Sequence, residues 1–181
     1  YIDKSGHQLS IKYIDSLTSV NKIFQTNNDE LLIVENENTL CRFNKSGDLI
    51  WKKHNFQIIE DVQENFDGSI ILVGQSNTGR FTYIEKIDSE GNSLSSAEYN
   101  ILPSTKIEVI NGFNDPSTGQ EFLVKSKSIS KCGNGDYLIS GIHGSSVFSQ
   151  LDNVIVMRLD SNLNIRWRST IHLLSALSPI E

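Results

Sequence analysis

The chain has 181 residues, a formal net charge of −6 and a pI near 5.2. An acidic chain lacks the basic face that nucleic acid requires, so we expect no nucleic-acid partner. No apolar run approaches the roughly 20 residues that a membrane-spanning helix needs. No phosphate-loop, dinucleotide or nucleophile-elbow motif occurs, and the sequence is therefore more informative about fold than about function.

The two cysteines, Cys41 and Cys132, are too few for a disulfide framework in a chain of this length. Cys41 falls in an expected strand, which predicts a half-buried thiol, and Cys132 falls in an expected turn, which predicts a surface thiol. This cysteine usage fits the cytosol and the bacterial exterior equally well. Because residue 1 is Tyr, we interpret the chain as processed, truncated or part of something longer.

One turn pattern recurs along the chain. An Asp or Asn opens each copy, and in three of the four copies a glycine follows three residues later. The four opening residues are Asp3, Asn44, Asp88 and Asp160, separated by 41, 44 and 72 residues. A period of about 40 to 50 residues with short strands is typical of β-propeller blades.

Each complete unit is predicted to contain four strands. The expected strands are 20–26, 31–35, 39–44 and 49–54; then 58–64, 70–75, 81–87 and 93–99; then 124–130, 137–142, 154–159 and 165–171. The second strand of each unit is the most apolar, which indicates burial on both faces. The predicted boundaries are the end of a preceding blade at 1–14, blades at 15–56, 57–100 and 101–171, and a tail or next strand at 172–181.

Glycine in these turns has a physical reason, because the backbone there needs a positive φ that glycine adopts without strain. Gly68, Gly79, Gly91 and Gly135 are expected to serve in this way. Leu163 stands where a glycine is expected, so we predict that Asn162 or Asn164 carries the positive φ in that turn.

Trp51 and Trp167 each lie seven residues after the residue that opens their turn. We interpret a tryptophan repeated at one structural position as packing between blades, since a buried indole removes a large apolar area from water. A platform for stacking against a sugar ring is the alternative.

The long third unit provides the only positional indications of a binding surface. Its extra residues form an insertion at about 101–121 and a longer loop at 144–152, and long loops in compact domains are often functional. The candidate binding residues in and beside these segments are Asn114, Asp115, His143 and Phe148.

Metal and cofactor signatures are weak. Oxygen-bearing side chains between Asn114 and Glu121 permit a calcium loop, but such a loop needs more carboxylates, so an ordinary turn is favoured. No two histidines have zinc-ligand spacing. We therefore assign no metal, cofactor or catalytic residue.

The stretches 135–141 and 158–160, Gly-Asp-Tyr-Leu-Ile-Ser-Gly and Arg-Leu-Asp, carry a resemblance to a known family. With Asp67-Gly68 and Lys86-Ile87-Asp88, they resemble bacterial propeller repeats of the quinoprotein-like kind. The likeness is closest to repeats of secreted and lipid-anchored Bacteroidetes surface proteins. The second unit departs from the pattern because it lacks the tryptophan. The resemblance implies a bacterial surface or periplasmic scaffold or binding domain.

The expected fold is all-β: a partial β-propeller of about three four-stranded antiparallel blades plus flanking strands. Propellers close with about four to eight blades, so we expect part of a larger propeller; a compact four-blade closure using both termini is the alternative. The expected function is a non-catalytic scaffold or protein-interaction domain, with a protein or the rest of the propeller as partner. The alternatives are a carbohydrate-binding or glycan-processing propeller and a fragment of a quinone-dependent oxidoreductase.

Overall fold

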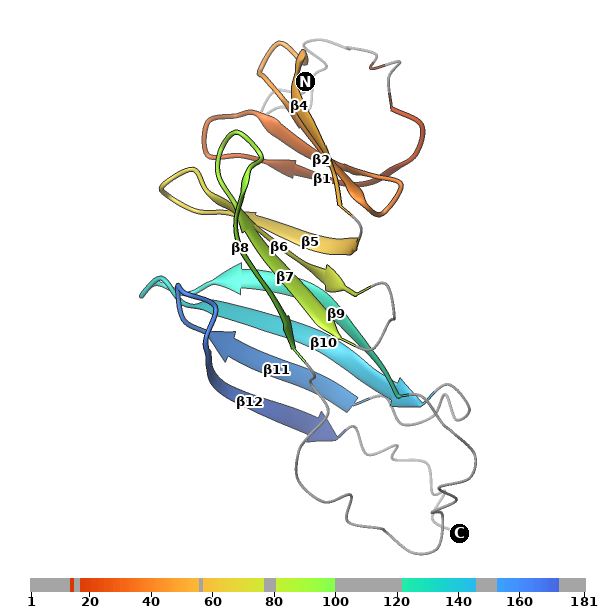
Figure 1. Cartoon of the computed structure of the whole chain (residues 1–181), viewed down its shortest axis with the longest axis vertical. Helices are drawn as coiled ribbons and strands as arrows, with labels where there is room; N and C mark the ends of the chain where they lie inside the picture. Colours follow the sequence, from red (N-terminus) through yellow and green to blue (C-terminus); the bar gives the residue numbers. More distant parts are fainter. Residues whose placement is uncertain are drawn as a thin grey trace, which may run out of the picture. The chain divides into compact units, whose positions relative to one another are not determined.

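This computed structural model describes residues 14, 17–55, 57–76, 81–99, 122–145 and 153–172. Throughout these ranges the regular structure is β-strand, and twelve strands form three four-stranded antiparallel sheets (Figure 1). The chain divides into two compact units, Tyr1–Asn55 with one sheet and Phe56–Glu181 with two. No helix in the described ranges is long and apolar enough to cross a bilayer. The all-β prediction is confirmed.

In every sheet, neighbouring strands follow one another in the chain. The first sheet contains β1 (Val20–Gln25), β2 (Leu31–Glu35), β3 (Thr39–Phe43) and β4 (Leu49–His54). The second contains β5 (Ile58–Glu64), β6 (Ile70–Gln75), β7 (Thr82–Ile87) and β8 (Ser93–Tyr99). The third contains β9 (Phe122–Lys131), β10 (Tyr137–Ser145), β11 (Asn153–Leu159) and β12 (Ile165–His172). All twelve predicted strands are present, and the insertion expected at 101–121 lies outside the described residues.

Six hairpin turns have the same hydrogen bonds, one after the first strand and one after the third strand of each sheet. The opening residue donates its N–H to the carbonyl four residues later, and the residue three later donates back, with N···O distances of 2.7–3.2 Å. The opening residues are Thr26, Asn44, Asn65, Asp88, Cys132 and Asp160. The repeat seen in the sequence is therefore a repeat of backbone geometry, and the turns opened by Thr26 and Cys132 share it without an opening Asp or Asn.

The residue three positions into each turn has a positive φ. Gly47, Gly68, Gly91 and Gly135 supply it in four turns. In the others Asp29 (φ 58°) and Leu163 (φ 68°) adopt it themselves, so the prediction that Asn162 or Asn164 would do so is wrong. Leu163 is only 5 % exposed and packs in the core of its unit. Burying leucine contributes about 2 kcal/mol, which offsets the roughly 1–2 kcal/mol cost of a left-handed residue.

Bulges recur at matching positions as well. An extra residue interrupts the first strand five positions before its turn, at Asn21, Glu60 and Lys127. The fourth strand of each sheet also has an extra residue, six positions after the residue that opens the preceding turn. These residues are Ile50, Leu94 and Arg166. Because bulges bend strands and increase their twist, the three sheets share the same local curvature.

The second and third sheets pack face to face within their unit. Their shared core contains Ile71, Val73 and Ile84 from the second sheet and Tyr137, Ile139, Ile155, Met157, Leu159 and Leu163 from the third. Hydrogen bonds and an ion pair join the same two sheets. Asp61 accepts from the N–H of Ile129 at 2.9 Å, and Lys127 lies 2.8 Å from Glu60. These polar contacts fix the register of one sheet on the other, which apolar packing alone does not.

The two tryptophans occupy matching positions. Trp51 pairs with Arg42 across β3 and β4, and Trp167 pairs with Arg158 across β11 and β12. Trp51 is half-buried, whereas Trp167 is 44 % exposed. The two tryptophans therefore share a structural position, as predicted. The predicted burial of Trp167 between blades is not seen among the described residues.

Candidate functional site

Only one of the four predicted binding residues, His143, falls within the residues that the structure describes. Asn114, Asp115 and Phe148 lie outside the described residues. The backbone of His143 lies in β10, opposite Asn153 and Val124, and not at the start of a loop. The strand continues to Ser145 because β9 extends to Phe122 and pairs with it along this whole length.

Both thiols differ from their predicted exposure. Cys41 is completely buried, where a half-buried thiol was expected. It lies in β3 among Ile33 and Phe43, on the face where Ile14 and Leu17 also pack. Cys132 opens the turn between β9 and β10 and is half-buried, where a surface thiol was expected.

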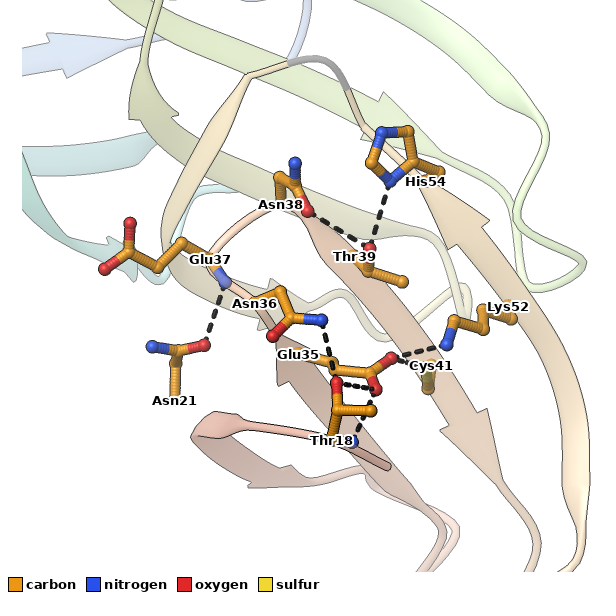
Figure 2. Close-up of polar contacts among 10 residues, drawn as sticks. All are labelled: Thr18, Asn21, Glu35, Asn36, Glu37, Asn38, Thr39, Cys41, Lys52 and His54. Carbon is orange, nitrogen blue, oxygen red and sulfur yellow. Dashed lines mark hydrogen bonds and ion pairs between the residues drawn. The ribbon is translucent and has the colours of Figure 1, made fainter. Parts of the chain in front are cut away.

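A polar cluster in the first sheet surrounds Glu35, at the end of β2 (Figure 2). Its side chain is almost fully buried, with 1 % exposed. One carboxylate oxygen accepts from the backbone N–H of Thr18 at 2.8 Å and from the Thr18 hydroxyl at 3.0 Å. The other oxygen accepts from the ammonium of Lys52 and lies 4.0 Å from the sulfur of Cys41.

Further hydrogen bonds connect the β2–β3 loop to the segment before β1 and to the start of β1. Asn36 donates its side-chain N–H to the Thr18 hydroxyl at 2.9 Å. The N–H of Glu37 donates to the side-chain oxygen of Asn21 at 2.8 Å, as Figure 2 shows. On the other side of the loop, Thr39 contacts the imidazole of His54 at 3.1 Å. The cluster therefore ties the chain at residues 18–21 to β2, β3 and β4.

Sequence reasoning missed this cluster, although the repeat contains a signal for it. Glu35 lies nine residues after the residue that opens its turn, and the same position in the other sheets is occupied by Gly74 and Gly141. A Cβ atom on Gly74 would come within 1.7 Å of the Ile58 carbonyl oxygen. In the first sheet the side chain of Glu35 occupies this position, opposite Val20 at the start of β1.

The electrostatics of the cluster follow from its contacts. The hydrogen bond from Lys52, followed by the bond from the Thr18 N–H, lowers the pKa of Glu35 despite its burial. The same bond to Glu35 raises the pKa of Lys52. Burial raises the pKa of the Cys41 thiol, and this effect outweighs the nearby ammonium of Lys52.

These shifts disfavour reaction chemistry at the cluster. A nucleophilic cysteine must be a thiolate, and a nucleophilic lysine must be neutral. A general acid at neutral pH needs a raised carboxyl pKa. Cys41, Lys52 and Glu35 are each shifted in the opposite direction. The arrangement is suited to holding a loop and a strand end in place.

The carboxylates of the turns serve the turns themselves. Asp88 accepts from the N–H of Asn92 at 2.8 Å and of Glu90 at 2.9 Å, and Asp160 accepts in the same way. The Asn92 side chain is the main reason that the pKa of Asp88 is lowered. No group of three or more potential metal ligands gathers within the described ranges.

No protein-family model matches the chain, and no curated protein matches it. Its fold is similar to a crystal structure of a protein of unknown function from Bacteroides caccae, with a TM-score of 0.50 and 13 % identity. The similarity covers 93 % of this chain and 67 % of that one. At this identity the likeness concerns the fold alone.

Proposed function

We propose that this chain is a non-catalytic scaffold or protein-interaction domain of a bacterial surface or periplasmic protein. The observation that supports this most directly is the Glu35 cluster. It combines a carboxylate, a thiol and an ammonium group, and each has its pKa shifted away from the reactive form. Its bonds instead fasten the segment before β1 to the sheet.

The repeated sheets support the scaffold part of the proposal. Three sheets have matching turns and bulges, and two of them pack through a shared core. We infer that they are blades of a larger propeller, because a closed ring needs about four to eight of them. A rigid array of this kind presents its loops for recognition. The proposed bacterial location rests on the resemblance of the repeats to Bacteroidetes surface proteins.

One observation favours a second function, carbohydrate binding. Trp167 exposes 44 % of its surface beside Arg158, its partner across the strands. An exposed indole can stack on the apolar face of a sugar ring, as aromatic side chains combine apolar area with a polar edge.

Two measurements on the full chain test these functions together. Cross-linking in the cells that produce the protein, followed by mass spectrometry, is expected to identify a protein partner attached through the loops or turns. A glycan array with the purified chain is expected to show no saturable binding. Saturable glycan binding that Trp167→Ala abolishes and Phe66→Ala does not would replace the interaction proposal by the carbohydrate-binding one. Phe66 is the matched control because it is also an exposed aromatic, with 91 % of its surface accessible.

A further inference from the structure

The third sheet has one apolar face that the described residues leave uncovered. In β10 and β11, Tyr137, Ile139 and Met157 point into the core shared with the second sheet. The alternate residues lie on the opposite face, and Trp167 and Ile171 join them through their pairing with Arg158 and Val154. We call this the open face; its apolar residues are Leu138, Ile142, Val154, Val156, Trp167 and Ile171.

Three of these six side chains are exposed, and Leu138, Val154 and Val156 are half-buried. Ile142 is 38 % exposed, Trp167 44 % and Ile171 51 %, although all three are large and apolar. A contiguous apolar surface of this kind is unfavourable in water and marks interaction sites in soluble proteins.

In the second sheet, the face equivalent to the open face is covered, and the structure shows by what. Counting from the turns, Leu138 matches Ile71, Val156 matches Ile84 and Ile171 matches Tyr99. Ile71 and Ile84 are fully buried, and Tyr99 packs against the same core. What covers them is the third sheet, through the face that contains Tyr137 and Ile139. The contact is head to tail, because a sheet uses one face to dock and the other to receive the next.

The polar contacts add a requirement on charge. Glu60 and Lys127 lie at the same bulge position of their sheets and pair with each other at 2.8 Å. If a further sheet docks on the third sheet in the same way, Lys127 becomes the residue that faces the incoming sheet, as Glu60 of the second sheet faces Lys127. An incoming sheet with an acid at this position would extend the alternating row, whereas a lysine would bring two like charges together.

We propose that the open face binds a further four-stranded antiparallel sheet of this repeat, which has an acidic side chain at its first-strand bulge. The inference builds on the proposed scaffold function and identifies its partner and the surface that the partner covers. A second copy of the third sheet fits poorly because it would place Lys127 against Lys127. A second copy of the whole chain fits less well, because Ile14 and Leu17 already pack against the matching face of its first sheet, around Ile33.

The test extends the full chain after Glu181 by a glycine–serine linker and a second copy of residues 57–99, which contains Glu60 and no tryptophan. A linker of about 15 residues spans about 20 Å on average. In a Trp51→Phe background Trp167 is the only tryptophan. We expect the extension to shift its emission to shorter wavelength and to lower its acrylamide quenching constant at least twofold.

Two changes should abolish this protection. One is Glu60→Lys in the appended copy, and the other is Val156→Asp on the open face. The matched control is Ser161→Asp, in an exposed turn, which should leave the protection of Trp167 unchanged. Circular dichroism and urea unfolding of the unextended Val156→Asp chain verify that it remains folded.

Several results would overturn the proposal. They are an unchanged Trp167 signal on extension, equal protection in the Glu60→Lys or Val156→Asp chains, and a Trp167 already shielded in the unextended chain. A concentration-dependent dimer of the unextended chain that Val156→Asp dissociates would assign the face to a second copy instead. None of these results bears on whether the chain is catalytic or binds glycans. The proposed scaffold function is therefore tested separately, by the cross-linking and glycan-array measurements.

Discussion

Replacing Glu35 by Gln measures what the buried carboxylate contributes to stability. The amide keeps the shape of the side chain and one acceptor oxygen but loses the charge that attracts Lys52 and the Thr18 N–H. Hydrogen bonds to a charged group contribute about 1.5–3 kcal/mol. The Lys52 side chain is 45 % exposed, so water screens its ion pair and the Thr18 bonds account for most of the loss. We therefore expect Glu35→Gln to lower the free energy of unfolding by about 2 kcal/mol at pH 7.

The pH dependence of this difference has a definite sign. The pKa of Glu35 is lowered in the folded state, mainly by the bond from Lys52, while an unfolded glutamate titrates at about 4.3. The folded state then binds fewer protons than the unfolded state between the two pKa values. The contribution is full above the unfolded pKa and is lost as the pH falls through the folded pKa. The gap between wild type and variant should thus be constant down to about pH 5 and shrink in more acidic solution.

Urea unfolding followed by the fluorescence of Trp51 provides the assay, because Trp51 lies in β4 of the same sheet. A Trp167→Phe background removes the other tryptophan. Glu37→Gln is the control, since Glu37 is exposed and lies two residues away; its effect should be within about 0.5 kcal/mol. Equal stability of Glu35→Gln and wild type at pH 7, or a gap that widens in acid, would refute the reasoning.

Two further predictions concern the thiols and the glycines. An aromatic disulfide reagent should modify Cys132 in the folded chain and Cys41 only after unfolding, because Cys41 is buried and its thiol pKa is raised; rapid reaction of both would contradict this. Gly74→Ala should destabilise the chain by about 3 kcal/mol in urea unfolding, since the new Cβ meets the Ile58 carbonyl at 1.7 Å. Gly133→Ala, whose Cβ would meet nothing within 4 Å, should change stability by less than about 1 kcal/mol; similar losses in both would show that the close approach at Gly74 is not the cause.

The apolar second strands were predictable because their pattern reflects burial directly. The run at 70–73 is buried at every residue, as its unbroken apolar character indicates. The turns at Gly68, Gly91 and Gly135 were equally predictable, because few other residues adopt a positive φ without strain; Gly79 lies outside the described residues. Leu163 was not, since its left-handed backbone is stabilised by contacts with residues distant in the chain.

The Glu35 cluster was beyond sequence reasoning for a related cause. A glutamate at the end of a strand predicts an exposed charge. Here Thr18 and Lys52, each 17 residues away in the chain, surround it and satisfy its oxygens. The only sign of this cluster in the sequence is that Glu35 stands where the other two units have Gly74 and Gly141.

The sequence by itself determined the twelve strands and the repeated turns, because these depend on local backbone preference and on the alternation of apolar residues. Only the tertiary structure decided which side chains meet. The burial of Glu35 between Thr18 and Lys52, the pairing of Lys127 with Glu60 and the exposure of Trp167 all depend on how strands and sheets dock. Docking brings together residues that lie far apart in the sequence, and a local sequence pattern contains no information about such contacts.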